Sequence, residues 1–144
     1  MMQDCQWPDL AEHYSKALHA AVAYILEHFD VHGIVVSGSI IRGNPDAGSD
    51  FDTYVIQANP ERQRVQKFFH GVPAELFVNP PAAIRSYFVS EQQAGRPCTA
   101  HMLATGFVIL DRAPIVQTLI HEARNALAQS PNLSAQALTF KQYG

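Results

Sequence analysis

The sequence predicts a single α/β or α+β domain in which a small mixed sheet of three to four or more strands packs against helices. Segments with apolar residues at helical spacing alternate with short apolar or β-branched runs, which is typical of helices that cover a sheet. The 144 residues can bury one core, and 47% of them are hydrophobic against 16% charged, which excludes a disordered chain. No repeat or linker divides the chain, so we expect one domain over residues 1–144.

The first half of the chain predicts a helix and two strands. From Leu10 to Phe29, apolar residues recur at steps of three and four, as on one face of a helix. The β-branched run 34–36 ends at Ser37-Gly38-Ser39, which predicts a buried strand that enters a tight turn. Turn-forming residues fill positions 44–49, and the aromatic and β-branched residues 51–56 predict the second strand.

The second half predicts four helices and two further strands. The expected elements are a helix from Pro60 to His70 closed by Gly71, a strand 74–78, helices 82–93 and 99–105, a strand 107–110 and a helix 114–129. The tail 130–144 is thin in apolar residues, and we expect it to need a partner or further sequence to become ordered.

Composition restricts the kind of partner. With 10 Lys and Arg against 13 Asp and Glu, the net charge is −3, which argues against a protein that holds a long nucleic acid by neutralising phosphates. The basic residues Arg62, Arg64 and Lys67 fall in the predicted helix 60–70, where we expect a solvated face without a functional role. The chain has no run of about 18 apolar residues and no signal-peptide pattern, so we expect no membrane contact and a cytoplasmic location.

Cysteine and histidine spacing indicates no metal site. Cys5 and Cys98 lie far apart and outside any metal-ligand motif, so we expect free thiols in a reducing compartment. His28 and His32 straddle a predicted helix end, and no third ligand lies at suitable spacing.

The chemistry is concentrated between residues 36 and 56. Gly38-Ser39 lies where a buried strand turns into a short helix, so backbone N–H groups and a small hydroxyl can approach a phosphate. Asp50 and Asp52 are two residues apart at the start of a strand, which puts both carboxylates on one face. Two such charges in a folded core repel each other unless a cation offsets them, and Mg²⁺ prefers carboxylate and phosphate oxygens.

Glu75 interrupts the apolar run of the strand 74–78. A buried carboxylate is costly when it is unpaired. If this strand lies beside 51–56, Glu75 joins Asp50 and Asp52 and serves as a metal ligand or a general base. The alternatives are pairing with an arginine or exposure at a sheet edge.

Together these residues resemble the nucleotidyltransferase superfamily that includes DNA polymerase beta, and within it the small bacterial minimal and aminoglycoside-type nucleotidyltransferases. The shared pattern is a Gly-Ser pair, about ten residues and then Asp-x-Asp, and here ten residues separate Ser39 from Asp50. Arg42-Gly43 and Ser49 also stand in the usual places. The resemblance covers residues 34–56 and extends less specifically to Val78.

The resemblance implies a role for each matching residue. Gly38 and Ser39, with Ser49 nearby, would hold the β- and γ-phosphates of a nucleoside triphosphate. Asp50 and Asp52 would bind two Mg²⁺ ions, and Glu75 would be the third carboxylate, which activates the acceptor hydroxyl. Many relatives carry Asp at this third position. Arg42 would steady the phosphates, and a structural ion pair with a neighbouring carboxylate is the alternative.

The leading hypothesis is a Mg²⁺-dependent enzyme that transfers AMP from ATP to a hydroxyl of a small molecule or a protein and releases pyrophosphate. One alternative is an antitoxin-like minimal nucleotidyltransferase that binds a helical partner protein and adenylylates it, and a second copy of the chain is a further candidate partner. Another is a degenerate domain that binds nucleotide without turnover.

Overall fold

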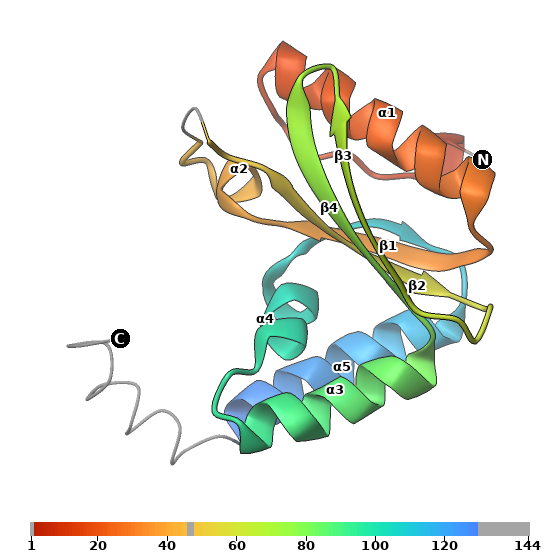
Figure 1. Ribbon diagram of the computed structural model, residues 1–144, viewed down its shortest axis with the longest axis vertical. Coiled ribbons are helices and arrows are strands. Elements are labelled where there is room, and N and C mark those ends of the chain that lie inside the picture. The colour runs from red at the N-terminus through yellow and green to blue at the C-terminus, as the bar shows by residue number, and fades with distance from the viewer. Residues whose placement is uncertain (1, 46–47, 130–144) are drawn as a thin grey trace.

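A five-stranded mixed sheet runs through the molecule with helices on both of its faces (Figure 1). The computed structural model describes residues 2–45 and 48–129. In chain order the elements are a 3-10 helix η1 (Met2–Asp4), α1 (Glu12–His28), β1 (Val31–Ser37), α2 (Ser39–Arg42), β2 (Phe51–Gln57), β3 (Gln63–Phe69), β4 (Val72–Asn79), α3 (Pro81–Gln93), α4 (Cys98–Thr105), β5 (Phe107–Asp111) and α5 (Pro114–Ala128). The predicted mixed fold class is confirmed.

The strand order is β3-β4-β2-β1-β5, and one parallel pair determines where side chains meet. β2 and β4 are parallel, while the other neighbouring strands are antiparallel. Parallel strands begin at the same edge of a sheet. In this register Asp52 is paired with Glu75, and on the other side of β2 it is paired with Ser37 of β1.

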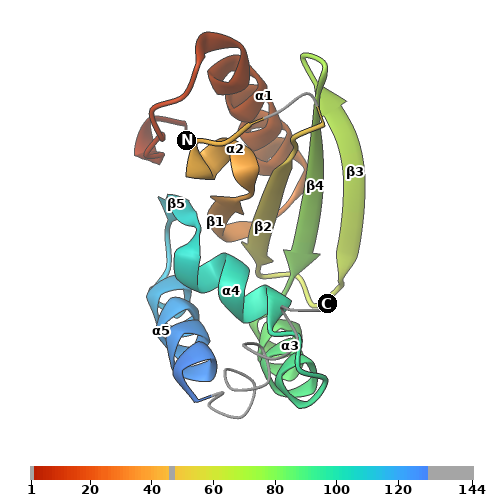
Figure 2. The ribbon, with the colours of Figure 1, turned by 90° about the vertical axis from the view of Figure 1, so that its left-hand side faces the viewer.

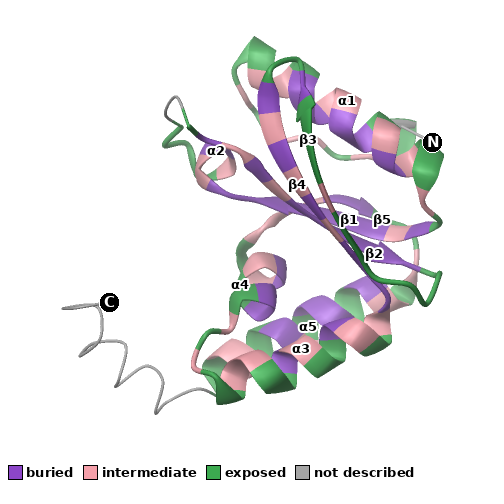
Figure 3. Cartoon of the chain, viewed as in Figure 1, coloured by how far each residue is buried: buried purple, intermediate pink, exposed green. Residues whose placement is uncertain are grey.

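Helix α1 covers one face of the sheet, and α3, α4 and α5 cover the other (Figure 2). Because side chains alternate along a strand, β2 contributes Phe51 and Val55 to the core under α1, and Tyr54 and Ile56 to the core under the other helices. Figure 3 shows these buried inner surfaces and the exposed outer faces of the helices. The two apolar cores hold the sheet rigidly between them, including the strand that carries Asp52.

The helix predicted at 60–70 is wrong, because residues 63–69 form the edge strand β3. Local helical propensity is overridden here by pairing with β4, from Gln63 opposite Val78 to Phe69 opposite Val72. Arg64 and Lys67 therefore lie on an exposed edge strand, with Arg62 just before it, and charged side chains there discourage edge-to-edge association. This position also brings Arg64 within reach of β4.

The turn between β3 and β4 explains the error. His70 and Gly71 have φ angles of 48° and 80°, so both central residues of this two-residue hairpin are left-handed. Gly71 ends a hairpin turn and not a helix. Strand β3 is therefore the one strand of this sheet that the sequence pattern missed.

Several smaller expectations also meet the structure. Cys5 and Cys98 are both free thiols. Trp7 stacks on His19, with ring centroids 3.6 Å apart, and Tyr14 packs edge-on against Phe51, so both aromatic residues have packing roles. Within residues 2–45 and 48–129, no helix has the length and apolar character needed to cross a membrane. The tail predicted to need a partner, 130–144, lies outside the described residues.

Candidate active site

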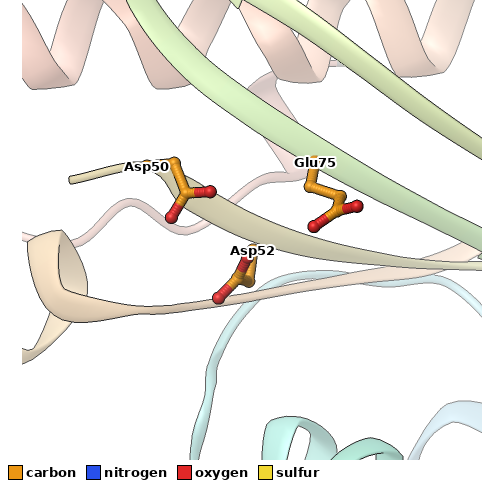
Figure 4. Close-up of side chains that lie close together, drawn as sticks. All are labelled: Asp50, Asp52 and Glu75. Atoms are coloured by element: carbon orange, nitrogen blue, oxygen red, sulfur yellow. The ribbon is translucent and has the colours of Figure 1, made fainter. Parts of the chain in front are cut away.

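The three acidic residues of the sequence pattern converge at one edge of the sheet (Figure 4). Asp50 precedes β2, Asp52 lies two residues further along the same face, and Glu75 is in register with Asp52 on β4. One carboxylate oxygen from each residue lies within 4.8 Å of the other two. All three residues are partly buried, so the cluster is set into the surface rather than spread over it.

Negative charge in this cluster is only partly balanced by the surrounding protein. Burial, then the charges of Asp50 and Glu75, raise the pKa of Asp52 to about 6, and the charge of Arg42 opposes this increase. A carboxyl group whose pKa is raised in this way ionises less readily than usual, and a bound cation would favour its charged form. The imbalance and the oxygen-only donor set fit a hard divalent cation such as Mg²⁺.

Glu75 is oriented by side chains of the edge strand. Its Oε2 atom accepts a hydrogen bond from Arg64 Nε and another, of 3.2 Å, from Gln66 Nε2. Only 14% of the Glu75 side chain is exposed, against 66% for Arg64. The sequence left a choice between pairing with an arginine and joining the carboxylate cluster. Glu75 does both. It pairs with Arg64 through Oε2, and it lies in the carboxylate cluster with Asp50 and Asp52.

The Gly38-Ser39 turn lies directly beside the acidic residues. Gly38 has a φ of 111°, and a Cβ atom there would stand 3.0 Å from the backbone oxygen of Asp50 and 3.6 Å from Asp52 Oδ2. A side chain at this position would be strained and crowded, so the close approach requires glycine. Ser39 Oγ donates a 2.8 Å hydrogen bond to Ser49 Oγ, which ties the turn to the loop before β2.

Arg42 ends the short helix α2, and its side chain is exposed. It makes no ion pair within 4.0 Å among the residues that the structure describes, so the alternative of a structural ion pair gains no support. Its charge nevertheless acts on Asp52, because it lowers the pKa of that carboxyl. Arg42 is therefore exposed and near enough to influence the cluster.

Tyr54 shares the face of Asp50 and Asp52 but belongs to the core. It is 1% exposed, and its hydroxyl accepts a 2.8 Å hydrogen bond from Asn79 Nδ2. Burial raises the pKa of Tyr54 to about 12. Tyr54 is therefore a core aromatic residue.

Sequence reasoning missed Arg64 and Gln66 at the site. Both were placed on a predicted helix, where they had no geometric relation to Glu75. The signal that could have found them is the His70-Gly71 pair: read as a hairpin turn, it pairs Gln66 with Glu75 and Arg64 with Phe77.

Comparisons with known proteins add information on the fold. A scan against protein-family models gave no match, and a search of curated proteins gave none either. Among solved structures, the chain is similar to a nucleotidyltransferase-like protein from Exiguobacterium sibiricum 255-15, with a TM-score of 0.57 and 13% sequence identity. The match covers 75% of this chain and 37% of that protein, so the chain spans well under half of its structural neighbour.

This similarity establishes the fold alone. The five-stranded mixed sheet with its covering helices is the nucleotidyltransferase fold, as the sequence pattern predicted. At this identity, neither the subfamily nor the substrate follows from the neighbour. Function has to be argued from the residues of the site.

Proposed function

We propose that this protein is a Mg²⁺-dependent nucleotidyltransferase that transfers AMP from ATP to a hydroxyl group and releases pyrophosphate. The observation that carries the proposal is the group of three carboxylates within 4.8 Å of one another beside a turn that only glycine can form. A shared fold with a nucleotidyltransferase-like protein agrees with it.

Asp50, Asp52 and Glu75 are the proposed metal ligands. Magnesium ions bound there supply positive charge that offsets the triphosphate and lowers the pKa of the acceptor hydroxyl. Gly38 and Ser39 hold the β- and γ-phosphates, since the turn offers close backbone approach, and Arg42 adds a positive charge near the carboxylates.

The transfer step is an in-line displacement at the α-phosphorus. The hydroxyl oxygen of the acceptor forms a bond to this phosphorus while the bond to the oxygen that bridges to the β-phosphate breaks. Pyrophosphate leaves with the electron pair of that bond. The hydroxyl proton passes to a carboxylate oxygen of Glu75 and on to solvent. The protein contributes mainly alignment and charge, which is what phosphoryl transfer demands.

The test uses ATP labelled at the α-phosphate, with Mg²⁺ and a cell extract as the source of acceptors. We expect pyrophosphate release and labelled product with the wild-type chain, and loss of at least about a hundredfold with Asp50→Asn or Asp52→Asn. Asp30→Asn, which changes an exposed aspartate after α1, is the matched control and should keep full activity. Full activity in both site variants would overturn the proposal. Label on a protein band would indicate a protein acceptor, and label on a small compound would indicate a metabolite.

A further inference from the structure

A cavity of about 600 Å³ adjoins the carboxylate cluster on the side of α4. Its sheet wall is formed by Asp52, Glu75 and Phe77, and its opposite wall includes Arg96 of the loop before α4 and His101 and Met102 of α4. A second cavity of about 630 Å³ shares Phe77 and Met102 with the first, so the two are neighbours on one face of the sheet. Cavities of this size hold small molecules.

The strand order puts this cavity on the opposite side of the carboxylates from the Gly38-Ser39 turn, which is named the phosphate turn after its proposed ligand. Ser37, which leads into Gly38-Ser39, pairs with Asp52 from one side, and Glu75 pairs with Asp52 from the other. Neither Gly38 nor Ser39 contributes to the walls of either cavity. The turn and the cavity therefore flank the metal-binding carboxylates.

The geometry of the displacement then decides which substrate enters the cavity. The attacking and leaving oxygens lie on opposite sides of the α-phosphorus. If the pyrophosphate is held at Gly38-Ser39, the acceptor approaches from the side of Glu75. The body of the acceptor then extends into the space between Phe77 and α4.

The cavity walls have a distinct charge pattern. Asp52 and the ion pair of Glu75 with Arg64 lie on the side of the carboxylate cluster. Elsewhere the walls carry two guanidinium groups that make no ion pair within the described residues, from Arg62 and Arg96, and one carboxylate, from Glu91. The Glu91 carboxylate accepts hydrogen bonds of 2.8 and 3.0 Å from the backbone N–H and hydroxyl of Thr99. Away from the carboxylate cluster, the walls therefore hold two positive groups and one negative group.

The same walls provide aromatic and positive surface. Arg64 lies over the Phe77 ring, 5.4 Å from its centroid, and Arg62 donates a 3.1 Å hydrogen bond to the hydroxyl of Tyr87. Arg96 is exposed, and its side chain has no ion pair within the described part of the chain. A flat apolar body can pack against Phe77 while an anionic group faces the guanidinium groups.

From these features we infer that the two cavities form the acceptor site and that the acceptor is a small hydroxyl compound with an aromatic or similarly flat body and an anionic group. This inference rests on the proposed nucleotidyl transfer. It argues against polyamines and other polycations as preferred acceptors, because Arg62 and Arg96 repel them at the part of the walls away from the carboxylate cluster.

The test compares two probes that share a phenol and differ in charge, 4-hydroxyphenylacetate and tyramine. Binding to the full chain is measured by NMR titration with Mg²⁺ and a non-hydrolysable ATP analogue present. We expect the anion to bind about tenfold more tightly than the cation, and Arg96→Gln to reduce this preference to about threefold or less. Arg124→Gln changes an exposed arginine on α5 that lines neither cavity, and it should leave the preference intact.

Three results would overturn the inference: equal or tighter binding of tyramine, no saturable binding of either probe at millimolar concentration, or binding of the anion only when the ATP analogue is left out. The last result would assign the cavity to the nucleoside. Because the titration needs no turnover, its outcome is separate from the transfer assay. An inactive protein that still prefers the anion would contradict the proposed function and leave the anion-binding cavity in place.

Discussion

Asp52 is a residue whose own charge opposes folding. Its pKa is raised from 3.8 to about 6, mainly by burial and then by Asp50 and Glu75. The folded state thus binds more protons at Asp52 than the unfolded state does between these values. The contribution of Asp52 to the free energy of unfolding is therefore greatest below about pH 4 and is lost as the pH rises through 6. Residues of this kind persist at functional sites at the expense of stability.

We therefore predict that Asp52→Asn stabilises the metal-free protein at pH 7.5. The expected gain in the free energy of unfolding is about 1–2 kcal/mol, kept below the full value of the pKa shift because solvent reaches this side chain. Urea unfolding at pH 4 and pH 7.5 measures it, and the gain should vanish at pH 4. A variant that is less stable than wild type at pH 7.5 would show that Asp52 is structurally paired.

The ion pair of Arg64 with Glu75 gives a second prediction at this scale. Arg64→Met leaves a largely buried carboxylate with Gln66 as its remaining donor, so we expect a loss of about 1 kcal/mol in the free energy of unfolding. In a Glu75→Gln background the same substitution should cost much less, because the charge it served is gone. Equal losses in both backgrounds would mean that Arg64 acts through Phe77 packing alone.

The hairpin of β3 and β4 is the element on which the shape of the site depends. It presents Arg64 and Gln66 to Glu75, and its turn uses two left-handed residues. We predict that Gly71→Ala lowers the free energy of unfolding by about 1 kcal/mol, since Cβ disfavours a φ of 80°. Thermal unfolding of the variant measures the loss. His70→Asn should leave the free energy of unfolding unchanged, because Asn readily adopts the left-handed conformation of this position. A Gly71→Ala variant as stable as the wild type would argue against the turn.

Elements with a clear apolar period could be predicted from the sequence, and the edge strand could not. The predicted helix 10–29 corresponds to Glu12–His28, and the predicted strands 51–56 and 74–78 correspond to Phe51–Gln57 and Val72–Asn79. These segments bury one face or both, so the spacing of their apolar side chains indicates the type of element. Strand β3 is mostly exposed, and its residues are fixed by pairing with β4 instead of by burial.

The same distinction applies to the site. Asp50 and Asp52 could be placed together from their spacing, because two residues on one strand share a face. That Glu75 joins them depends on the parallel pairing of β2 with β4, which local pattern does not encode. The two cavities beside α4 could not be predicted from the sequence, since their walls combine residues from β2, β3, β4, α3 and α4.

Across the molecule, two apolar cores hold the sheet between helical layers. The carboxylate cluster lies where β1 ends beside β2 and β4. The phosphate turn flanks the carboxylates on the β1 side, and the proposed acceptor cavity flanks them on the β4 side. In the proposed reaction, this arrangement would separate the two substrates and leave the α-phosphorus beside Asp50, Asp52 and Glu75.

A measurement of cation binding tests whether Asp50, Asp52 and Glu75 form a metal site. Manganese(II) can be titrated into the protein in the presence of a non-hydrolysable ATP analogue, with bound and free ion distinguished by electron paramagnetic resonance. The account predicts saturable binding by the wild-type chain and by Asp30→Asn, and a loss of at least about tenfold in affinity with Asp50→Asn or Asp52→Asn. Equal affinity in all four proteins would contradict it, because the three carboxylates would then not be the metal site.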